Sequence, residues 1–171
     1  MPPWESIEGD ELRQGDFLPR CRVLVLTDPL PENPGVIDGE IGTRDLIVLT
    51  HSCDLLNPPG PRTVTLCAIG TVEEFEGVNP HMGRDGRWGK AAQGSMPGLH
   101  LIASPMDPGN GRAALVVDFR ETFALPTTYL RHHAAGIGRR WRVVPPYLEQ
   151  LSRAFGDYFS RVGVPAQVPR P

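Results

Sequence analysis

Short apolar segments separated by stretches rich in Gly and Pro make up most of the first 125 residues of this chain. Gly and Pro occur 19 times each in 171 residues, and both residue types interrupt helices and strands. The chain is long enough to form one domain with its own hydrophobic core. No apolar run approaches the about 20 residues that a membrane-spanning helix needs, so we expect no membrane partner. Many short strands are therefore favoured over a helical bundle.

Seven runs of apolar and β-branched residues, bounded by turn-forming residues, indicate β-strands. They cover residues 16–18, 22–26, 45–51, 63–69, 99–103, 114–119 and 122–125. The Pro- and Gly-rich segments 28–39 and 56–62 are expected to be loops. We expect a helical turn over 72–77 and a long surface loop over 79–98.

The C-terminal part of the chain has the periodicity of an amphipathic helix. Large apolar residues recur mostly at steps of three and four, at Leu148, Leu151, Phe155, Tyr158, Phe159 and Val162. Pro145 and Pro146 suit the first turn of this helix, and Gly163 followed by Pro165 ends it. A shorter helix is expected over 128–135.

Strands followed by helices predict a mainly β fold with C-terminal helices, of the α+β class. In this fold a small antiparallel barrel packs against the last helix. We expect one domain over residues 1–163, β-rich over 12–125 and helical over 127–163. Residues 164–171 are expected to form a flexible tail.

Four residues at the ends of the first predicted strands form a pattern. Gly15 and Asp16 precede these strands, and a Pro-rich loop follows. Arg44 then stands directly before the apolar run DLIVLT, and Thr71 follows the run TVTLCAIG. Over about residues 12–71, this pattern resembles the PemK/MazF family of toxin ribonucleases.

The resemblance implies an SH3-like barrel and a ribonuclease site. In such a site Arg44 would stabilise the negative charge that develops on the RNA phosphate, and Thr71 would position that phosphate. The family usually has Pro after this arginine, whereas this chain has Asp45, whose carboxylate opposes phosphate binding. Residues 1–54 carry 11 acidic and 4 basic side chains, a net charge of −7 that repels RNA.

A second candidate site lies in THSCDLL, residues 50–56, at the end of a predicted buried strand. His51 and Cys53 are two residues apart, so in a strand they point to the same side, where an imidazole can activate a thiol. The alternative is that Cys53 is a small buried hydrophobic residue and that Asp54 starts an Asx turn. We expect no metal site, because the His and Cys spacings match no zinc motif, and no cofactor, because nucleotide- and flavin-binding motifs are absent.

The stretch from Arg131 to Arg153 concentrates basic residues. Its candidates for contact with a phosphate or an acidic protein surface are Arg139, Arg140, Trp141 and Arg142. The alternative is that these residues bind the acidic N-terminal third of the same chain. Tyr147 and Tyr158, on the predicted C-terminal helix, are candidates for the centre of a protein interface.

We therefore predict a non-catalytic regulatory or protein-interaction component on a MazF-like barrel, in a bacterial toxin–antitoxin or defence system. The alternatives are an RNA endoribonuclease that uses Arg44 and Thr71 and a thiol enzyme that uses His51 and Cys53. A protein partner is expected, and the other partners considered are RNA and a second copy of the chain as a homodimer. The N-terminus lacks the features of a signal peptide, and the three cysteines form no Cys-x-x-Cys pair. Both features favour the cytoplasm.

Overall fold

A computed structural model of the chain describes residues 2–26, 39–84 and 86–160. Its strands are β1 (Trp4–Ile7), β2 (Phe17–Leu26), β3 (Gly39–Val48), β4 (Thr63–Thr71), β5 (Leu99–Ile102), β6 (Leu115–Pro126) and β7 (Arg140–Val143). Its helices are α1 (Ser52–Leu56), α2 (Val72–Val78), α3 (Arg87–Ala92), α4 (Thr127–Ile137) and α5 (Tyr147–Phe159), with 3₁₀ turns η1 (Pro80–Gly83) and η2 (Gly111–Ala113). The predicted α+β class is confirmed, but the fold is not mainly β, because α1, α2 and α3 lie between the strands and the helices are not confined to the C-terminal part.

All strand pairs are antiparallel. Five strands form a sheet in the order β2-β3-β4-β6-β5, and β1 pairs with β7 in a two-stranded ribbon. An isolated bridge between Asp16 and Arg142 joins the ribbon to the start of β2, and the Val143 N–H donates to the Gly15 carbonyl at 3.0 Å. Within the described residues neither sheet closes on itself, so the predicted barrel is not confirmed.

Side chains of α4 cover one edge of the five-stranded sheet. The Tyr129 hydroxyl accepts a hydrogen bond from the Arg22 N–H at 2.6 Å, and His133 Nε2 donates to the Pro19 carbonyl at 2.8 Å. Near Pro19 and Arg22, the edge of β2 therefore binds side chains of a helix, where barrel closure would need another strand. The opposite edge is β5, which has four residues.

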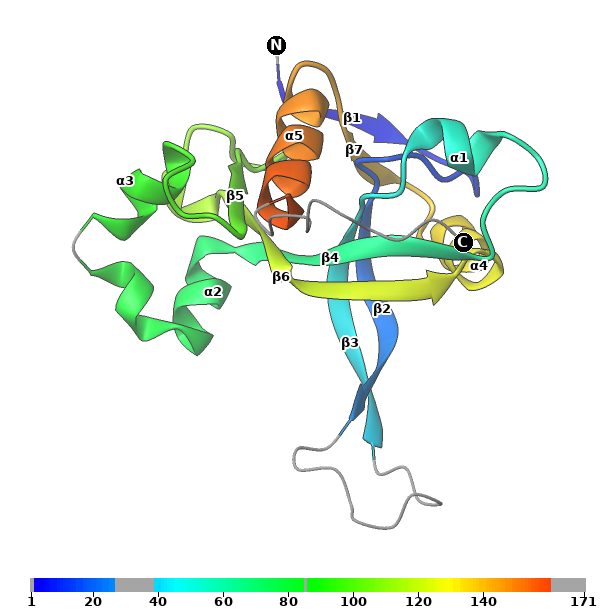
Figure 1. Cartoon of the computed structure of the whole chain (residues 1–171), viewed down its shortest axis with the longest axis horizontal. Helices are drawn as coiled ribbons and strands as arrows, with labels where there is room; N and C mark the ends of the chain where they lie inside the picture. The colour runs from blue at the N-terminus through cyan, green and yellow to red at the C-terminus, as the bar shows by residue number, and fades with distance from the viewer. Residues whose placement is uncertain (1, 27–38, 85, 161–171) are drawn as a thin grey trace, which may run out of the picture.

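Strands β2 and β3 extend past the other strands as a two-stranded arm (Figure 1). Their pairing runs out to Leu26 and Gly39, whereas β4 pairs only with Leu46–Val48 of β3. We call residues 21–26 and 39–44 the arm. The predicted loop over 28–39 lies outside the described residues, apart from Gly39, which belongs to β3.

Each face of the five-stranded sheet packs against its own helix, because side chains alternate across the strands. On β4, Val64 and Leu66 pack in a cluster with Leu130 of α4. The next positions, Cys67 and Ile69, pack in a second cluster that includes residues of α5. Burial on both faces explains why residues 46–48 of β3 and residues 115–117 of β6 are continuously apolar.

A bulge in β6 changes which residues of this strand face each helix. Residues 67–68 of β4 are adjacent, yet they pair with Thr122 and Asp118, so residues 119–121 lie outside the ladder. Before the bulge, Leu115 and Val117 pack in the cluster that includes α5. After the bulge, Phe123 and Leu125 pack in the cluster that includes α4. The predicted strands 114–119 and 122–125 are therefore one strand with a bulge.

The last helix, α5, has the apolar face that its periodicity predicted. On α5, Leu151 is fully buried, and Leu148, Phe155 and Tyr158 pack beside it on the same core. The rings of Phe155 and Phe119 meet edge to face with centroids 5.5 Å apart, which holds α5 against β6. The helix ends at Phe159 with Ser160 as its C-cap, so the prediction that it continues to Val162 is wrong, and Gly163 itself lies outside the described residues.

The segment 79–98 is not the long loop that its polarity predicted, because it contains η1 and α3. Trp88 of α3 packs edge to face on Phe75 of α2, with ring centroids 5.7 Å apart. The Trp88 Nε1–H also donates to Glu76 Oε1 at 2.6 Å. This contact between two short helices is what organises the segment, and neither helix has a strong periodic signal of its own.

The basic run near residue 140 contains a strand that the sequence did not reveal. This strand, β7, pairs with β1, and Trp4 at the start of β1 donates from Nε1 to the Ala103 carbonyl at 2.6 Å. Both strands have four residues and carry charged side chains, so each depends on its distant partner.

Asp16 holds this ribbon against the main sheet through two arginines. Asp16 Oδ2 lies 3.2 Å from Arg140 Nη2 and 3.1 Å from Arg142 Nη2, and Asp16 Oδ1 also accepts from Arg142 Nε. The side chains of Asp16 and Arg140 are fully buried. Arg140 also donates to the carbonyl oxygens of Gly9 and Glu11, which ties residues 9–16 to β7.

Removing the charge of Asp16 should destabilise the fold strongly. Asp16→Asn leaves Arg140 buried without a counter-charge, and we expect the free energy of unfolding to fall by about 3–5 kcal/mol in urea titrations. Asp157→Asn is the matched control, because it breaks an ion pair with Arg153 that is largely exposed to solvent, and it should change stability little. Equal losses in the two variants would contradict the role given to Asp16.

Candidate functional site

The segment THSCDLL leaves β3 and forms a single helical turn. After β3 ends, the N–H groups of Leu49 and Thr50 still bind the Thr65 carbonyl, and His51 then caps α1. Leu55 is buried and anchors this turn, while Pro58 follows the C-cap and stops it. The predicted strand 45–51 is therefore three residues too long at its end, because β3 stops at Val48.

His51 and Cys53 contact each other at this turn. His51 Nδ1 lies 3.0 Å from Cys53 Sγ, and the thiol lies 3.8 Å from Asp54 Oδ1. All three residues are exposed. The alternative in which Cys53 is buried is wrong, because the thiol is open to solvent. The two side chains meet as predicted, but at the start of a helix and not along a strand.

Residues 12–16 hold the turn in place. The Gln14 N–H donates to Ser52 Oγ at 3.1 Å, and Gln14 Nε2 donates to the Leu49 carbonyl at 3.0 Å. Gln14 is itself buried, so these hydrogen bonds are shielded from water. The sequence analysis missed Gln14 and Ser52 as supporting residues, because no local pattern connects positions 38 residues apart.

The other two cysteines are buried in the two cores. Burial raises the pKa of Cys21 to about 12, with a further contribution from Asp45. Burial also raises the pKa of Cys67 to about 12, with contributions from Asp118 and Glu121. Both thiols therefore stay protonated near neutral pH, and Cys53 is the exposed cysteine.

Alkylation should separate Cys53 from the buried cysteines. We expect iodoacetamide to modify native Cys53 more than about 100-fold faster than Cys21 or Cys67 near pH 8, because the thiolate is the reacting species. Peptide mapping by mass spectrometry measures the three rates. In concentrated guanidinium chloride the rates should converge, and similar rates for all three in the native protein would refute the assignment.

Arg44 lies among carboxylates. Its Nε donates to Glu121 Oε1 at 3.2 Å, and its Nη1 donates to the Thr43 carbonyl at 3.0 Å. A small depression of about 180 Å³ beside it is also lined by acidic side chains, namely those of Asp45, Glu74, Asp118 and Glu121. An RNA phosphate approaching Arg44 would meet this negative charge.

Thr71 serves as the N-cap of α2. Its hydroxyl accepts from the Glu74 N–H at 3.1 Å, and Glu74 Oε2 accepts from the Thr71 N–H at 2.7 Å. The Thr71 hydroxyl also donates to Glu74 Oε2 at 3.0 Å. This capping box explains why a helix follows β4 directly, and it engages the hydroxyl that the toxin resemblance assigned to phosphate.

The basic run mainly contacts the acidic N-terminal segment of the same chain, as the second alternative predicted. Arg139 pairs with Glu8 at 3.5 Å, and Arg140 and Arg142 both bind Asp16. The prediction that Arg140 contacts a partner is corrected, because its side chain is fully buried.

The aromatic candidates of the same region contribute to packing. Trp141, Tyr147 and Tyr158 are partly buried against the core that contains Leu151. Tyr158 also lies against Phe119, with ring centroids 6.2 Å apart. Their contacts therefore support the position of α5, and the structure leaves only part of each ring accessible.

No group of three or more His, Cys, Asp or Glu side chains in the described part of the chain is arranged to hold a metal ion. None of the described helices is long and apolar enough to cross a bilayer. Comparison with models of protein families gives no match, and comparison with curated proteins gives none either.

Proposed function

We propose that His51 and Cys53 form the reactive centre of a cysteine-dependent protein that acts on acyl compounds. The observation that carries this proposal is the distance of 3.0 Å between Nδ1 and Sγ on an exposed turn. A thiol within hydrogen-bond reach of an imidazole is the arrangement that generates a cysteine nucleophile. The support from Gln14 to Ser52 and Leu49 limits the movement of this turn.

The reaction proceeds in two balanced steps. His51 takes the proton from Cys53 while Sγ forms a bond to the acyl carbon. The bond from that carbon to the leaving group then breaks, and His51 returns the proton to the departing oxygen, nitrogen or sulfur. Water or another nucleophile next attacks the thioester, with His51 again as the base, and releases the free thiol.

Acylation by p-nitrophenyl acetate should test this centre. We expect release of nitrophenolate with formation of an acetyl thioester on Cys53, which mass spectrometry detects, and no thioester in Cys53→Ser. His51→Gln should slow acylation about 100-fold, because general base catalysis by the imidazole is lost.

The matched control is His81→Gln, which removes an exposed histidine from η1. This variant should react like the unaltered protein and keep its pH–rate profile. The proposal fails if His51→Gln acylates at the unaltered rate with the same pH dependence, because Cys53 would then react as an ordinary exposed thiol.

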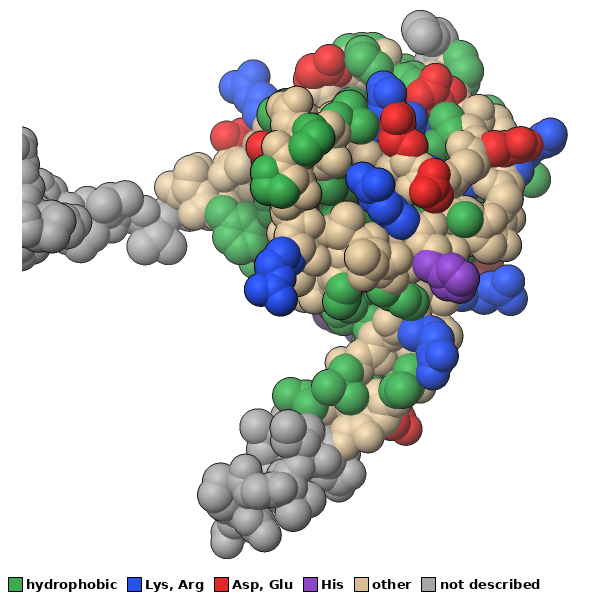
Figure 2. Space-filling view, turned by 90° about the vertical axis from the view of Figure 1, so that its right-hand side faces the viewer, with side chains coloured by type: hydrophobic (Ala, Val, Ile, Leu, Met, Phe, Trp, Pro, Cys, Tyr) green, Lys and Arg blue, Asp and Glu red, His purple; other side chains and the backbone are tan. Residues whose placement is uncertain are grey.

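The arm supports a second candidate, the predicted protein-interaction role. Leu24, Leu26 and Ile41 are 61 %, 49 % and 64 % exposed, and Figure 2 shows hydrophobic side chains gathered along the arm. Leu24 pairs directly with Ile41, so these side chains share one face. A two-stranded hairpin with an exposed apolar face is marginally stable in water and gains from further strands.

We propose a second copy of this chain as the partner of the arm. Antiparallel pairing of two β3 edges about Gly42 would place Glu40 of each copy opposite Arg44 of the other. The two Ile41 side chains would then be diagonal neighbours on one face. This pairing adds Glu40 of the other copy to the carboxylates around each Arg44, which already contacts Glu121 at 3.2 Å, and it extends the arm to four strands.

A charge exchange tests this interface. Glu40→Arg and Arg44→Glu should each weaken dimerisation about 10-fold, because like charges then face each other, and the double variant should restore it. Sedimentation velocity over a series of concentrations measures the equilibrium, and circular dichroism confirms folding. A monomer at every concentration, or a double variant no better than the single ones, would exclude the pairing.

A further inference from the structure

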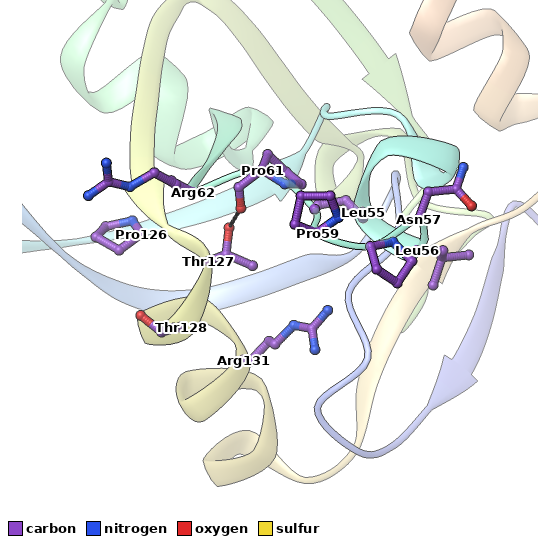
Figure 3. A pocket seen from close by; sticks show the side chains of 12 residues that line it. Leu55, Leu56, Asn57, Pro59, Pro61, Arg62, Pro126, Thr127, Thr128 and Arg131 are labelled. Atoms are coloured by element: carbon purple, nitrogen blue, oxygen red, sulfur yellow. Dashed lines mark hydrogen bonds between the residues drawn. The ribbon is translucent and has the colours of Figure 1, made fainter.

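A cavity of about 610 Å³ lies between the loop after α1 and the start of α4 (Figure 3). We propose that it binds a small organic phosphate. The volume falls in the range of about 300–1,000 Å³ that is typical of small-molecule sites. The cavity is distinct from the His51–Cys53 centre, because neither of those residues lines it.

Two arginines supply the charge for such a ligand. Arg131 comes from α4 and Arg62 from the residue before β4, and both line the cavity. No carboxylate is among the described residues that form its wall. Figure 3 shows the two side chains at opposite ends of the cavity, so Arg131 binds the anion directly and Arg62 adds to the positive potential. In a wall without a carboxylate, this potential attracts a doubly charged phosphate monoester more strongly than a singly charged carboxylate.

Arg62 and Arg131 form no ion pair with any described residue, unlike most other arginines in the described part of the chain. Eight arginines do pair with carboxylates, namely Arg13, Arg44, Arg112, Arg120, Arg139, Arg140, Arg142 and Arg153. In a chain with a net charge of −3, charge that stays unpaired beside a cavity is available to an outside anion.

The two walls of the cavity are tied together, so the site exists before a ligand binds. Thr127 Oγ1 donates to the Pro61 carbonyl at 2.6 Å, and the Thr127 N–H donates to the Arg62 carbonyl at 3.0 Å. Figure 3 shows the first of these hydrogen bonds between the loop and the start of α4. A preformed site avoids the entropy cost of ordering its walls.

Apart from Asn57, Thr127 and Thr128, the remaining wall is largely apolar and accommodates the organic part of the ligand. Leu55, Leu56 and three prolines of the 58–61 loop line it. Figure 3 shows Arg131 extending from α4 toward the side of the cavity where Leu55 and Pro59 lie, with Arg62 at the other end. An anionic group bound by Arg131 would therefore bring an attached ring or chain against apolar side chains.

A ¹H–¹⁵N NMR titration with phenyl phosphate tests the proposal. We expect saturable shifts of the Gly60, Thr127 and Thr128 amides, and weaker binding of benzoate at the same ionic strength. Arg131→Gln should raise the Kd about 10-fold, because a charge-assisted hydrogen bond is lost. Arg62→Gln should raise it less, because this side chain lies at the other end of the cavity and contributes only through its charge.

The matched control is Arg84→Gln, which removes one exposed charge from a residue that does not line this cavity, and it should leave the Kd unchanged. A retained spectrum in each variant shows that the fold is intact. The proposal is overturned if phenyl phosphate causes no saturable shifts up to its solubility limit, or if Arg84→Gln weakens binding as much as Arg131→Gln does. Benzoate binding as tightly as phenyl phosphate would also overturn it.

Discussion

The buried carboxylate of Asp16 is the contact on which the relative positions of the chain segments depend. Arg140 and Arg142 both bind it, and a charge in the interior is tolerated only when it is paired in this way. This contact fixes β7 beside the start of β2 and so places the β1–β7 ribbon on the sheet. It also orders the segment in which Gln14 reaches Ser52. The turn that carries the thiol is therefore supported through Asp16.

Internal pairing of charge decides which parts of the surface remain available. Residues 1–54 have a net charge of −7, whereas residues 55–171 contain 13 basic and 9 acidic side chains. The fold brings these two parts together, so most basic side chains near β7 are occupied by the N-terminal segment. The neighbourhood of Arg44 is likewise dominated by carboxylates. The arginines beside the cavity at α4 form no ion pair among the described residues, which is why net charge alone was a poor guide to the site that we propose for an anion.

Sequence patterns predicted the elements whose signals are local. The periodicity of α5, the helical turn after Thr71 and the apolar strands on either side of the 56–62 loop all follow from residues within a few positions of each other. The ribbon of β1 and β7 had no such signal, because its partners are more than 130 residues apart. Trp88 was assigned to a loop because its packing partner, Phe75, belongs to another helix and no periodic pattern links the two residues.

The amino-acid sequence alone determined the α+β class, the antiparallel strands, the two long helices and the proximity of His51 to Cys53, because a spacing of two residues is short enough for local geometry to decide. Only the tertiary structure decided that the sheet stays open within the described residues, with α4 bound to part of the β2 edge. It also decided which cysteine is exposed and which of the described arginines pair with carboxylates. Those properties depend on side chains that meet across the whole chain, and no window of sequence contains both partners.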